Sequence, residues 1–311
     1  MIELPCGHCL GCKLDYAKHW SERIMAEAQS WPVNCFITLT YNENNIRRNN
    51  AGKATLCERD VQLFLKRLRK EQKGVGSATD KNGEMQKPIR YFYCGEYGTK
   101  NHRPHYHIII FNWKPNDLKA YKKSINGEQL YTSKYLQNLW GLGFAPIGTV
   151  TIASAGYVAR YCMKKASEEK PAKNIYKTQY IDGIPKSIQY IDPAEPAKEF
   201  IRMSRMPGLG YYYFLSNEKK CIRNGGIWVQ NNGKPKLATL PRYFSKMLEK
   251  AGKWEIDEYI KYEKEKQAKV AKEKYEASIS APTEKNEKYW TIKNNKIKNL
   301  IEKAKFLKRN L

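Results

Sequence analysis

The sequence predicts an α+β fold, in which helices flank a set of strands. The main observation is that helical and strand patterns alternate between residues 13 and 166. A second observation is that the strand candidates 89–94 and 105–111 are close enough in the chain to pair with each other. The chain has 311 residues, of which 41% are hydrophobic, so it is long enough to bury a substantial core.

The first elements are recognised from composition and periodicity. Residues 13–30 predict a helix that ends before Trp31-Pro32, and residues 35–41 predict a strand because they are rich in β-branched and aromatic residues. Residues 61–68 predict an amphipathic helix, whose apolar face is formed by Val61, Phe64, Leu65 and Leu68. The polar, glycine-containing segment 71–87 predicts a loop.

The alternation continues with the strand candidates 89–94 and 105–111. A helix around residues 131–140 is expected to stop at the Gly141-Leu142-Gly143 break. A fourth strand at residues 146–152 and a helix at residues 154–166 complete this region.

Beyond residue 166 the pattern changes. Residues 168–196 are polar and contain proline and glycine, and they predict an insertion or linker. The segments 225–229 and 236–239 flank Asn232-Gly233, a strong signal for a β-hairpin turn. After residue 250 the chain is rich in lysine and glutamate and predicts a helical tail, which either docks on the body of the protein or contacts nucleic acid.

The charge of the chain indicates the class of its partner. Lysine and arginine total 56 against 31 aspartates and glutamates, a formal net charge of +25. This excess predicts a polyanion as partner, with an anionic membrane surface as the alternative. The 22 tyrosines favour stacking on the bases of single-stranded nucleic acid. No apolar run approaches the roughly 18–20 residues that cross a bilayer, and no secretion signal is recognised, so a membrane-spanning or secreted protein is not expected.

Three of the five histidines lie close together in the chain. His105 and His107 alternate with Tyr106 at the start of an apolar strand, so their rings point to the same side. Glu96 ends the preceding strand candidate and lies beside the rings if the two strands pair. Two imidazoles and a carboxylate suit Mg²⁺ or Mn²⁺ acting as a Lewis acid on phosphate. The alternative is that the paired histidines are ordinary polar surface.

A pair of tyrosines follows on the helix predicted over residues 154–166. Tyr157 and Tyr161 are four residues apart and therefore share a helix face, with Lys164 and Lys165 on or beside it. A phenol is a weak nucleophile at neutral pH, and nearby lysines would favour its phenolate. Two tyrosines can act in turn, one holding a DNA end while the other attacks. The alternative is that both are half-buried packing residues.

Three of the eight cysteines are clustered near the start of the chain. Cys6, Cys9 and Cys12 have the spacing of a zinc or iron–sulfur ligand set, which His8 or an upstream cysteine would complete. The alternative is that they are small buried thiols that cap the first helix. The remaining cysteines are scattered, a pattern typical of a reducing compartment.

Two arginines are weaker candidates. Arg103, next to His102, is placed to contact phosphate near the histidines. Arg205 lies in the segment 204–210, which precedes a run of aromatic residues. This segment either lines a path for a single strand or is a simple loop before a strand.

Taken in their order along the chain, these motifs resemble the HUH endonuclease superfamily, whose members nick single-stranded DNA to start rolling-circle replication. Three further segments resemble the replication initiators of the gokushovirus branch of the microviruses, namely residues 5–12, 36–41 and 203–210. The resemblance runs from about residue 5 to 245 and does not cover the tail.

The resemblance implies a central, mainly antiparallel sheet flanked by helices. It implies that His105, His107 and Glu96 hold Mg²⁺ or Mn²⁺. Tyr157 and Tyr161 would be the nucleophiles, accompanied by Lys164. Cleavage would leave a 5′-phosphotyrosine and free a 3′-hydroxyl for synthesis, and a later attack would rejoin the displaced circle. We expect DNA contacts from Thr38, Thr40, Tyr41, Arg103, Lys165 and Arg205, and a separate Zn²⁺ at Cys6, Cys9 and Cys12.

The resemblance also implies partners and an organisation into regions. The partners would be single-stranded DNA at a viral origin and the host helicase and DNA polymerase, in the cytoplasm of a host bacterium. The expected regions are a cysteine motif with a helix (1–30), a nuclease core (31–167), an accessory region (168–250) and a lysine- and glutamate-rich helical tail (251–311). The alternatives are a non-enzymatic single-strand binding or packaging protein, and a transposase or plasmid mobilisation enzyme.

Overall fold

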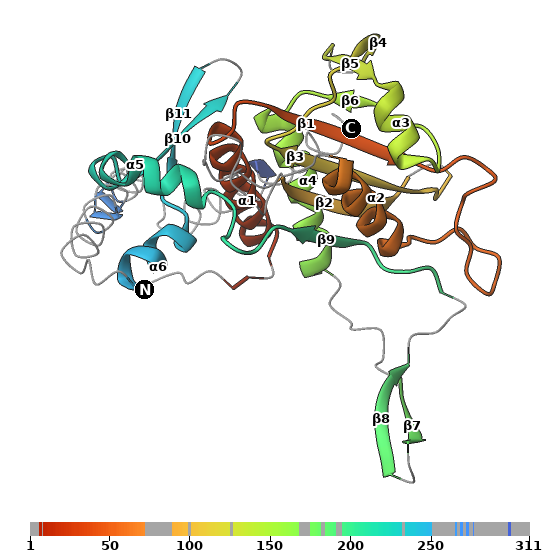
Figure 1. The fold of residues 1–311 in the computed structure, drawn as a ribbon. Helices are drawn as coiled ribbons and strands as arrows, with labels where there is room; N and C mark the ends of the chain where they lie inside the picture. Colours follow the sequence, from red (N-terminus) through yellow and green to blue (C-terminus); the bar gives the residue numbers. More distant parts are fainter. Residues whose placement is uncertain are drawn as a thin grey trace. The chain divides into compact units, whose positions relative to one another are not determined.

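The chain divides into two compact units in the computed structural model (Figure 1). The larger contains residues 31–150 and 158–204, and the smaller contains residues 1–30, 151–157 and the chain from 205 onwards. The structure describes residues 6–7, 9–71, 89–98, 101–124, 127–167, 175–181, 184–190, 195–231 and 234–250, and isolated positions between 265 and 299.

The larger unit is built on a seven-stranded sheet with the order β4-β5-β6-β1-β3-β2-β9. Every pair of neighbouring strands in it is antiparallel, which confirms the predicted α+β fold with a mainly antiparallel sheet. The strands are β1 (Asn34–Thr40), β2 (Arg90–Tyr97), β3 (Pro104–Phe111), β4 (Lys119–Lys123), β5 (Gln129–Thr132), β6 (Ile147–Gly148) and β9 (Phe200–Met203).

Two helices cover one face of this sheet, α2 (Glu58–Glu71) and α3 (Lys134–Trp140). The four apolar residues that predicted an amphipathic α2 are all buried in the core. The strands contribute every second residue to the same core, as in β3, where Tyr106, Ile108 and Ile110 point towards the helices. The intervening residues His105, His107 and Ile109 therefore lie on the opposite face of the sheet.

Two elements near α3 differ from the prediction. The helix expected around residues 131–140 begins only at Lys134, because Ser133 caps it by accepting a hydrogen bond from the Leu136 N–H. Residues 129–132 form β5 instead. The strand expected at 146–152 is only two residues long. It ends early because Thr151 and Ser154 exchange hydrogen bonds that start α4 (Ile152–Ser167).

The prediction of an insertion or linker at residues 168–196 is wrong for its central part. Two strands, β7 (Ile175–Ile181) and β8 (Ile184–Tyr190), pair there as an antiparallel hairpin. The isoleucines and tyrosines of these segments favour strands, and the Asp182-Gly183 dipeptide between them is a hairpin signal. Lysine, glutamine and proline between the strand-forming residues obscured the pattern.

The smaller unit contains α1 (Leu10–Gln29), α5 (Tyr211–Arg223), the strands β10 (Gly226–Asn231) and β11 (Lys234–Thr239), and α6 (Arg242–Lys250). The predicted hairpin is confirmed as β10 and β11. The strand expected after residues 204–210 is wrong, because Tyr211 begins α5. Glu27 of α1 accepts a hydrogen bond from the Gly210 N–H at 2.6 Å, and Arg23 donates to the Leu209 carbonyl, so the end of this loop is anchored to α1.

The tail predicted over residues 251–311 lies outside the described residues, apart from isolated positions. Among the helices that the structure describes, none is long and apolar enough to cross a membrane.

Candidate metal centre

Pairing of β3 with its two neighbours gathers a set of polar side chains on one face of the sheet. The register between β2 and β3 puts Glu96 directly opposite His105, with His107 two residues further along. The register between β1 and β3 puts Thr38 opposite His107 and Thr40 opposite His105. Directly paired residues of an antiparallel ladder point to the same side, so all five share this face.

Glu96 lies between the two imidazoles. Its Oε1 atom is 2.6 Å from Nε2 of His105 and 2.8 Å from Nε2 of His107. The ligand atoms of the three residues lie within 4.8 Å of one another. Glu96 is only 3% exposed and His107 8%, so the cluster is not the ordinary polar surface that the sequence left open as an alternative.

Both rings are held by a second contact at Nδ1. His105 donates from Nδ1 to the backbone carbonyl of Arg103 at 3.1 Å, since a carbonyl oxygen only accepts. Nδ1 of His107 lies 3.0 Å from the hydroxyl oxygen of Thr38, and the Phe36 ring stacks on this imidazole. These contacts turn Nε2 of each ring towards Glu96, which is how metal-ligating histidines are commonly oriented.

The charge state of the cluster follows from its burial and its hydrogen bonds. Burial alone would raise the pKa of Glu96, but the hydrogen bonds from His105 and His107 outweigh it and lower this pKa to about 2. Burial also opposes the charged form of His105, yet the hydrogen bond to Glu96 raises its pKa. For His107 burial dominates and lowers the pKa. At neutral pH a charged carboxylate therefore faces a neutral His107.

The donor set suits a divalent cation. Imidazole nitrogen and carboxylate oxygen are ligands for Mn²⁺, and carboxylate oxygen is also a ligand for Mg²⁺. Because the proton on Nδ1 of His105 is held by Arg103, its Nε2 lone pair is the one that a cation would take in place of a proton. The residues present therefore fit a bound metal ion.

The predicted helix that carries both candidate nucleophiles is confirmed as α4. Tyr157 is half-buried, and the neighbouring Val158 is buried. The side chains of Tyr161, Lys164 and Lys165 lie outside the described residues. Helical spacing therefore places the two tyrosines on one face of α4, and their role as nucleophiles stays a prediction.

The residues expected to contact DNA from the first family motif have different surroundings. The Thr38 hydroxyl faces His107, and the Thr40 hydroxyl donates to the Phe144 carbonyl at 2.9 Å. Tyr41 is only 5% exposed and lies in the core, where its hydroxyl donates to Asp60. Burial of Tyr41 leaves no exposed hydroxyl for DNA. Sequence reasoning missed the role of Thr38, whose only sequence signal is its place in the family motif.

The two arginines and the cysteines are also placed. Arg103 pairs with the Glu43 carboxylate and donates to the Tyr41 carbonyl at 2.9 Å, so part of its guanidinium is already engaged. Arg205 is exposed in the smaller unit. The three predicted cysteine ligands come together at the start of α1.

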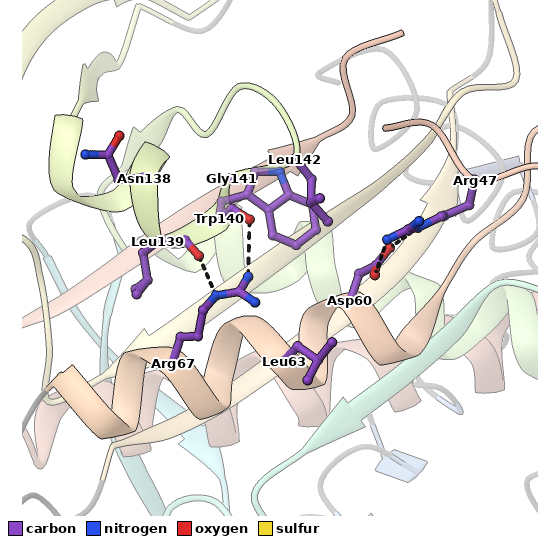
Figure 2. Close-up of a pocket in the computed structure, with 9 residues that line it drawn as sticks. All are labelled: Arg47, Asp60, Leu63, Arg67, Asn138, Leu139, Trp140, Gly141 and Leu142. Atoms are coloured by element: carbon purple, nitrogen blue, oxygen red, sulfur yellow. Dashed lines mark hydrogen bonds and ion pairs between the residues drawn. The ribbon is translucent and has the colours of Figure 1, made fainter. Parts of the chain in front are cut away.

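A pocket of about 280 Å³ lies on the other face of the sheet, at α2 and the end of α3 (Figure 2). Its arginines are occupied by the protein itself. Arg67 donates to the carbonyls of Leu139 and Trp140, and Arg47 pairs with Asp60. The histidines point away from this face, so the pocket is not part of the metal centre.

Comparison with known proteins places this cluster in a family. Residues 34–166, which include Glu96, both histidines and both tyrosines, match the model of a family described as replication-associated protein ORF2. The chain is 34% identical over 273 residues to the replication-associated protein ORF2 of Spiroplasma virus 4, covering 86% of this chain and 74% of that protein.

Two further relatives have similar descriptions. The chain is 39% identical over 162 residues to the replication-associated protein VP4 of Bdellovibrio phage phiMH2K, covering 52% of this chain and 48% of that protein. It is 26% identical over 251 residues to the replication-associated protein ORF4 of Chlamydia phage 1, covering 79% and 54%. This chain thus spans about half the length of each of these two relatives. No solved structure matches it. In agreement with the resemblance to microvirus replication initiators, the chain belongs to the family of phage replication-associated proteins.

Proposed function

We propose that this chain initiates phage replication by nicking single-stranded DNA at the viral origin through a tyrosine. The observation that carries the proposal is the buried cluster of Glu96, His105 and His107 in the segment that matches the family. A purely structural cluster has no need to orient two Nε2 atoms towards one carboxylate. The excess of positive charge supports DNA as the substrate.

In this proposal Glu96, His105 and His107 hold Mg²⁺ or Mn²⁺. When bound, the ion would act as a Lewis acid on the scissile phosphate. Thr38 and the Arg103 carbonyl keep the two rings turned towards the ion, which limits the reorganisation needed when it binds.

The covalent step uses the phenol of Tyr157 or Tyr161. Its oxygen forms a bond to the phosphorus, and the bond from phosphorus to the 3′ oxygen of the preceding nucleotide breaks. The phenol loses its proton to solvent, and the leaving 3′ oxygen takes one up. Lys164 is proposed to favour the phenolate. The products are a 5′-phosphotyrosine and a free 3′-hydroxyl.

The second tyrosine, or the 3′-hydroxyl at the end of a round, then attacks the phosphotyrosine. This exchanges one phosphodiester for another, so rejoining needs no external source of energy. The host polymerase would extend the freed 3′-hydroxyl after the host helicase opens the duplex, and the setting for these steps is the cytoplasm of a host bacterium.

The proposal is tested by looking for the covalent intermediate. Full-length protein is incubated with a single-stranded origin oligonucleotide and Mn²⁺, and the products are analysed by denaturing electrophoresis and mass spectrometry. We expect an adduct whose mass equals protein plus the 3′ fragment. It should fall to background in the double variant Tyr157→Phe, Tyr161→Phe and persist in Tyr121→Phe, an exposed tyrosine on β4.

An adduct that survives the double variant would exclude these nucleophiles. Tight oligonucleotide binding with no cleaved product under any divalent cation would instead favour a non-enzymatic single-strand binding protein.

A further inference from the structure

We propose that Cys6, Cys9 and Cys12 form a binding site for one zinc ion at the start of α1. The site belongs to the smaller unit and differs in chemistry from the cluster of Glu96, His105 and His107. Its ligands are thiolates, which prefer zinc to magnesium or manganese. The inference is independent of the proposed nicking activity.

The separations of the three sulfur atoms match those around a single ion. Sγ of Cys12 is 3.5 Å from Sγ of Cys9 and 3.9 Å from Sγ of Cys6, and the three sulfurs lie within 4.8 Å of one another. With zinc–sulfur bonds of about 2.3 Å, tetrahedral geometry puts two thiolates about 3.8 Å apart. An iron–sulfur cluster fits less well, because each cysteine would bind a different iron and the sulfurs would lie further apart.

Backbone amides around the sulfurs would stabilise negative charge on them. The Cys9 N–H donates to Sγ of Cys6 at 3.2 Å, and the Cys12 N–H donates to Sγ of Cys9 at 3.5 Å. Gly7, at φ +76°, adopts the left-handed conformation that brings Cys6 back towards the others. Cys9 and Cys12 also lie in the N-cap and first turn of a 20-residue helix, whose dipole favours thiolate.

Packing does not account for these cysteines. Cys6 and Cys9 are exposed and Cys12 is half-buried, so the alternative of three small buried thiols is wrong. Cys9 does cap α1, but serine, threonine, aspartate and asparagine are the residues that fill this position best. A sulfur at the cap, with two more beside it, points to a ligand that requires sulfur.

Three thiolates leave one coordination position for a fourth donor. His8, which the sequence suggested for this role, lies outside the described residues. Binding of zinc would tie the segment before α1 to the first turn of that helix. We therefore expect zinc to stabilise the smaller unit by linkage, since the ion binds the folded arrangement and not the extended chain.

The site is tested by zinc content on full-length protein kept reduced, loaded with zinc and then dialysed. The background is the variant Glu96→Gln, His105→Ala, His107→Ala, so that the other cluster does not contribute. We expect one zinc per chain by inductively coupled plasma mass spectrometry. The ion should be lost on adding Cys6→Ser, Cys9→Ser, Cys12→Ser and kept on adding Cys57→Ser. Cobalt in place of zinc should give thiolate charge-transfer bands that the triple cysteine variant lacks.

The variant Cys9→Asp separates metal binding from helix capping. Aspartate caps a helix at least as well as cysteine, so a capping role predicts unchanged zinc content and unchanged or higher thermal stability. The proposal predicts loss of the cobalt–thiolate bands and of the zinc-dependent rise in Tm. Zinc content that is zero in the background protein, or equal in the background and the triple cysteine variant, would overturn the site without touching the nicking proposal.

Discussion

A single hydroxyl on β1 contributes to the geometry of the metal centre. Thr38 lies opposite His107 in the register, and its oxygen is 3.0 Å from Nδ1 of that ring. Thr40 lies opposite His105 in the same way, but its hydroxyl donates to the Phe144 carbonyl. Two threonines on one strand, two residues apart, thus have different partners, and only one of them orients a ligand.

This difference predicts the effect of removing each hydroxyl. Thr38→Val is expected to weaken Mn²⁺ binding by about 10–100-fold, because the ring of His107 loses the contact that fixes its orientation. Thr40→Val is the matched control and should bind Mn²⁺ nearly as the unmodified chain does. Isothermal titration calorimetry on the full chain measures both. Equal losses in the two variants would show a general disturbance of β1 and contradict an orienting role for Thr38.

At the scale of elements, a buried polar network ties α2 to the sheet. Asp60 of α2 accepts two hydrogen bonds from Arg47 at 2.8 and 2.9 Å and one from the Tyr41 hydroxyl at 2.7 Å. The Tyr106 hydroxyl of β3 accepts from the Cys57 N–H at 2.7 Å just before the helix begins. Tyr106 stands between His105 and His107, so the network fixes the strand that carries the ligands.

The network predicts a pH-dependent contribution to stability. Burial would raise the pKa of Asp60, but Arg47 and Tyr41 outweigh it and lower the pKa. A depressed pKa in the folded state stabilises the fold above the ordinary carboxyl range, and this stability is lost as pH falls through the folded value. Asp60→Asn should therefore cost about 1–3 kcal/mol at pH 7, with a smaller difference below about pH 4.

Urea denaturation from pH 7 to pH 3 measures this difference. Glu71→Gln, exposed at the end of the same helix, is the control and should change the free energy of unfolding by less than about 0.5 kcal/mol. A loss for Asp60→Asn that stays constant down to pH 3 would show that the ionised carboxylate is not the source.

At the scale of the whole molecule, the net charge of +25 governs association with DNA. Such binding releases counterions, so the logarithm of the association constant should fall with the logarithm of salt concentration, with a slope of about −0.7 per phosphate neutralised on a single strand. Fluorescence anisotropy with a labelled oligonucleotide between low and physiological salt measures the slope. Chelation of divalent cations should abolish the covalent adduct but change this binding little. A flat salt dependence would contradict a phosphate-tracking surface.

Much of the local structure could be predicted from the sequence. The apolar face of α2, the strand that carries His105 and His107, the helix of the two tyrosines and the β10–β11 hairpin all follow from periods of 3.6 or 2 and from turn residues, which depend on near neighbours. These signals were strong enough to bring Glu96 into the predicted cluster, because only a short connection separates it from the histidines.

The contacts that depend on distant segments were decided by the tertiary structure alone. β9 pairs with β2 across more than 100 residues of chain, Thr38 meets His107 from 69 residues away, and the Tyr41 hydroxyl turns into the core rather than towards DNA. Sheet register and buried hydrogen-bond partners are chosen by the packing of the whole unit, and no local period encodes them. The sequence by itself therefore determined which side chains carry the chemistry, while the fold decided how those side chains are held.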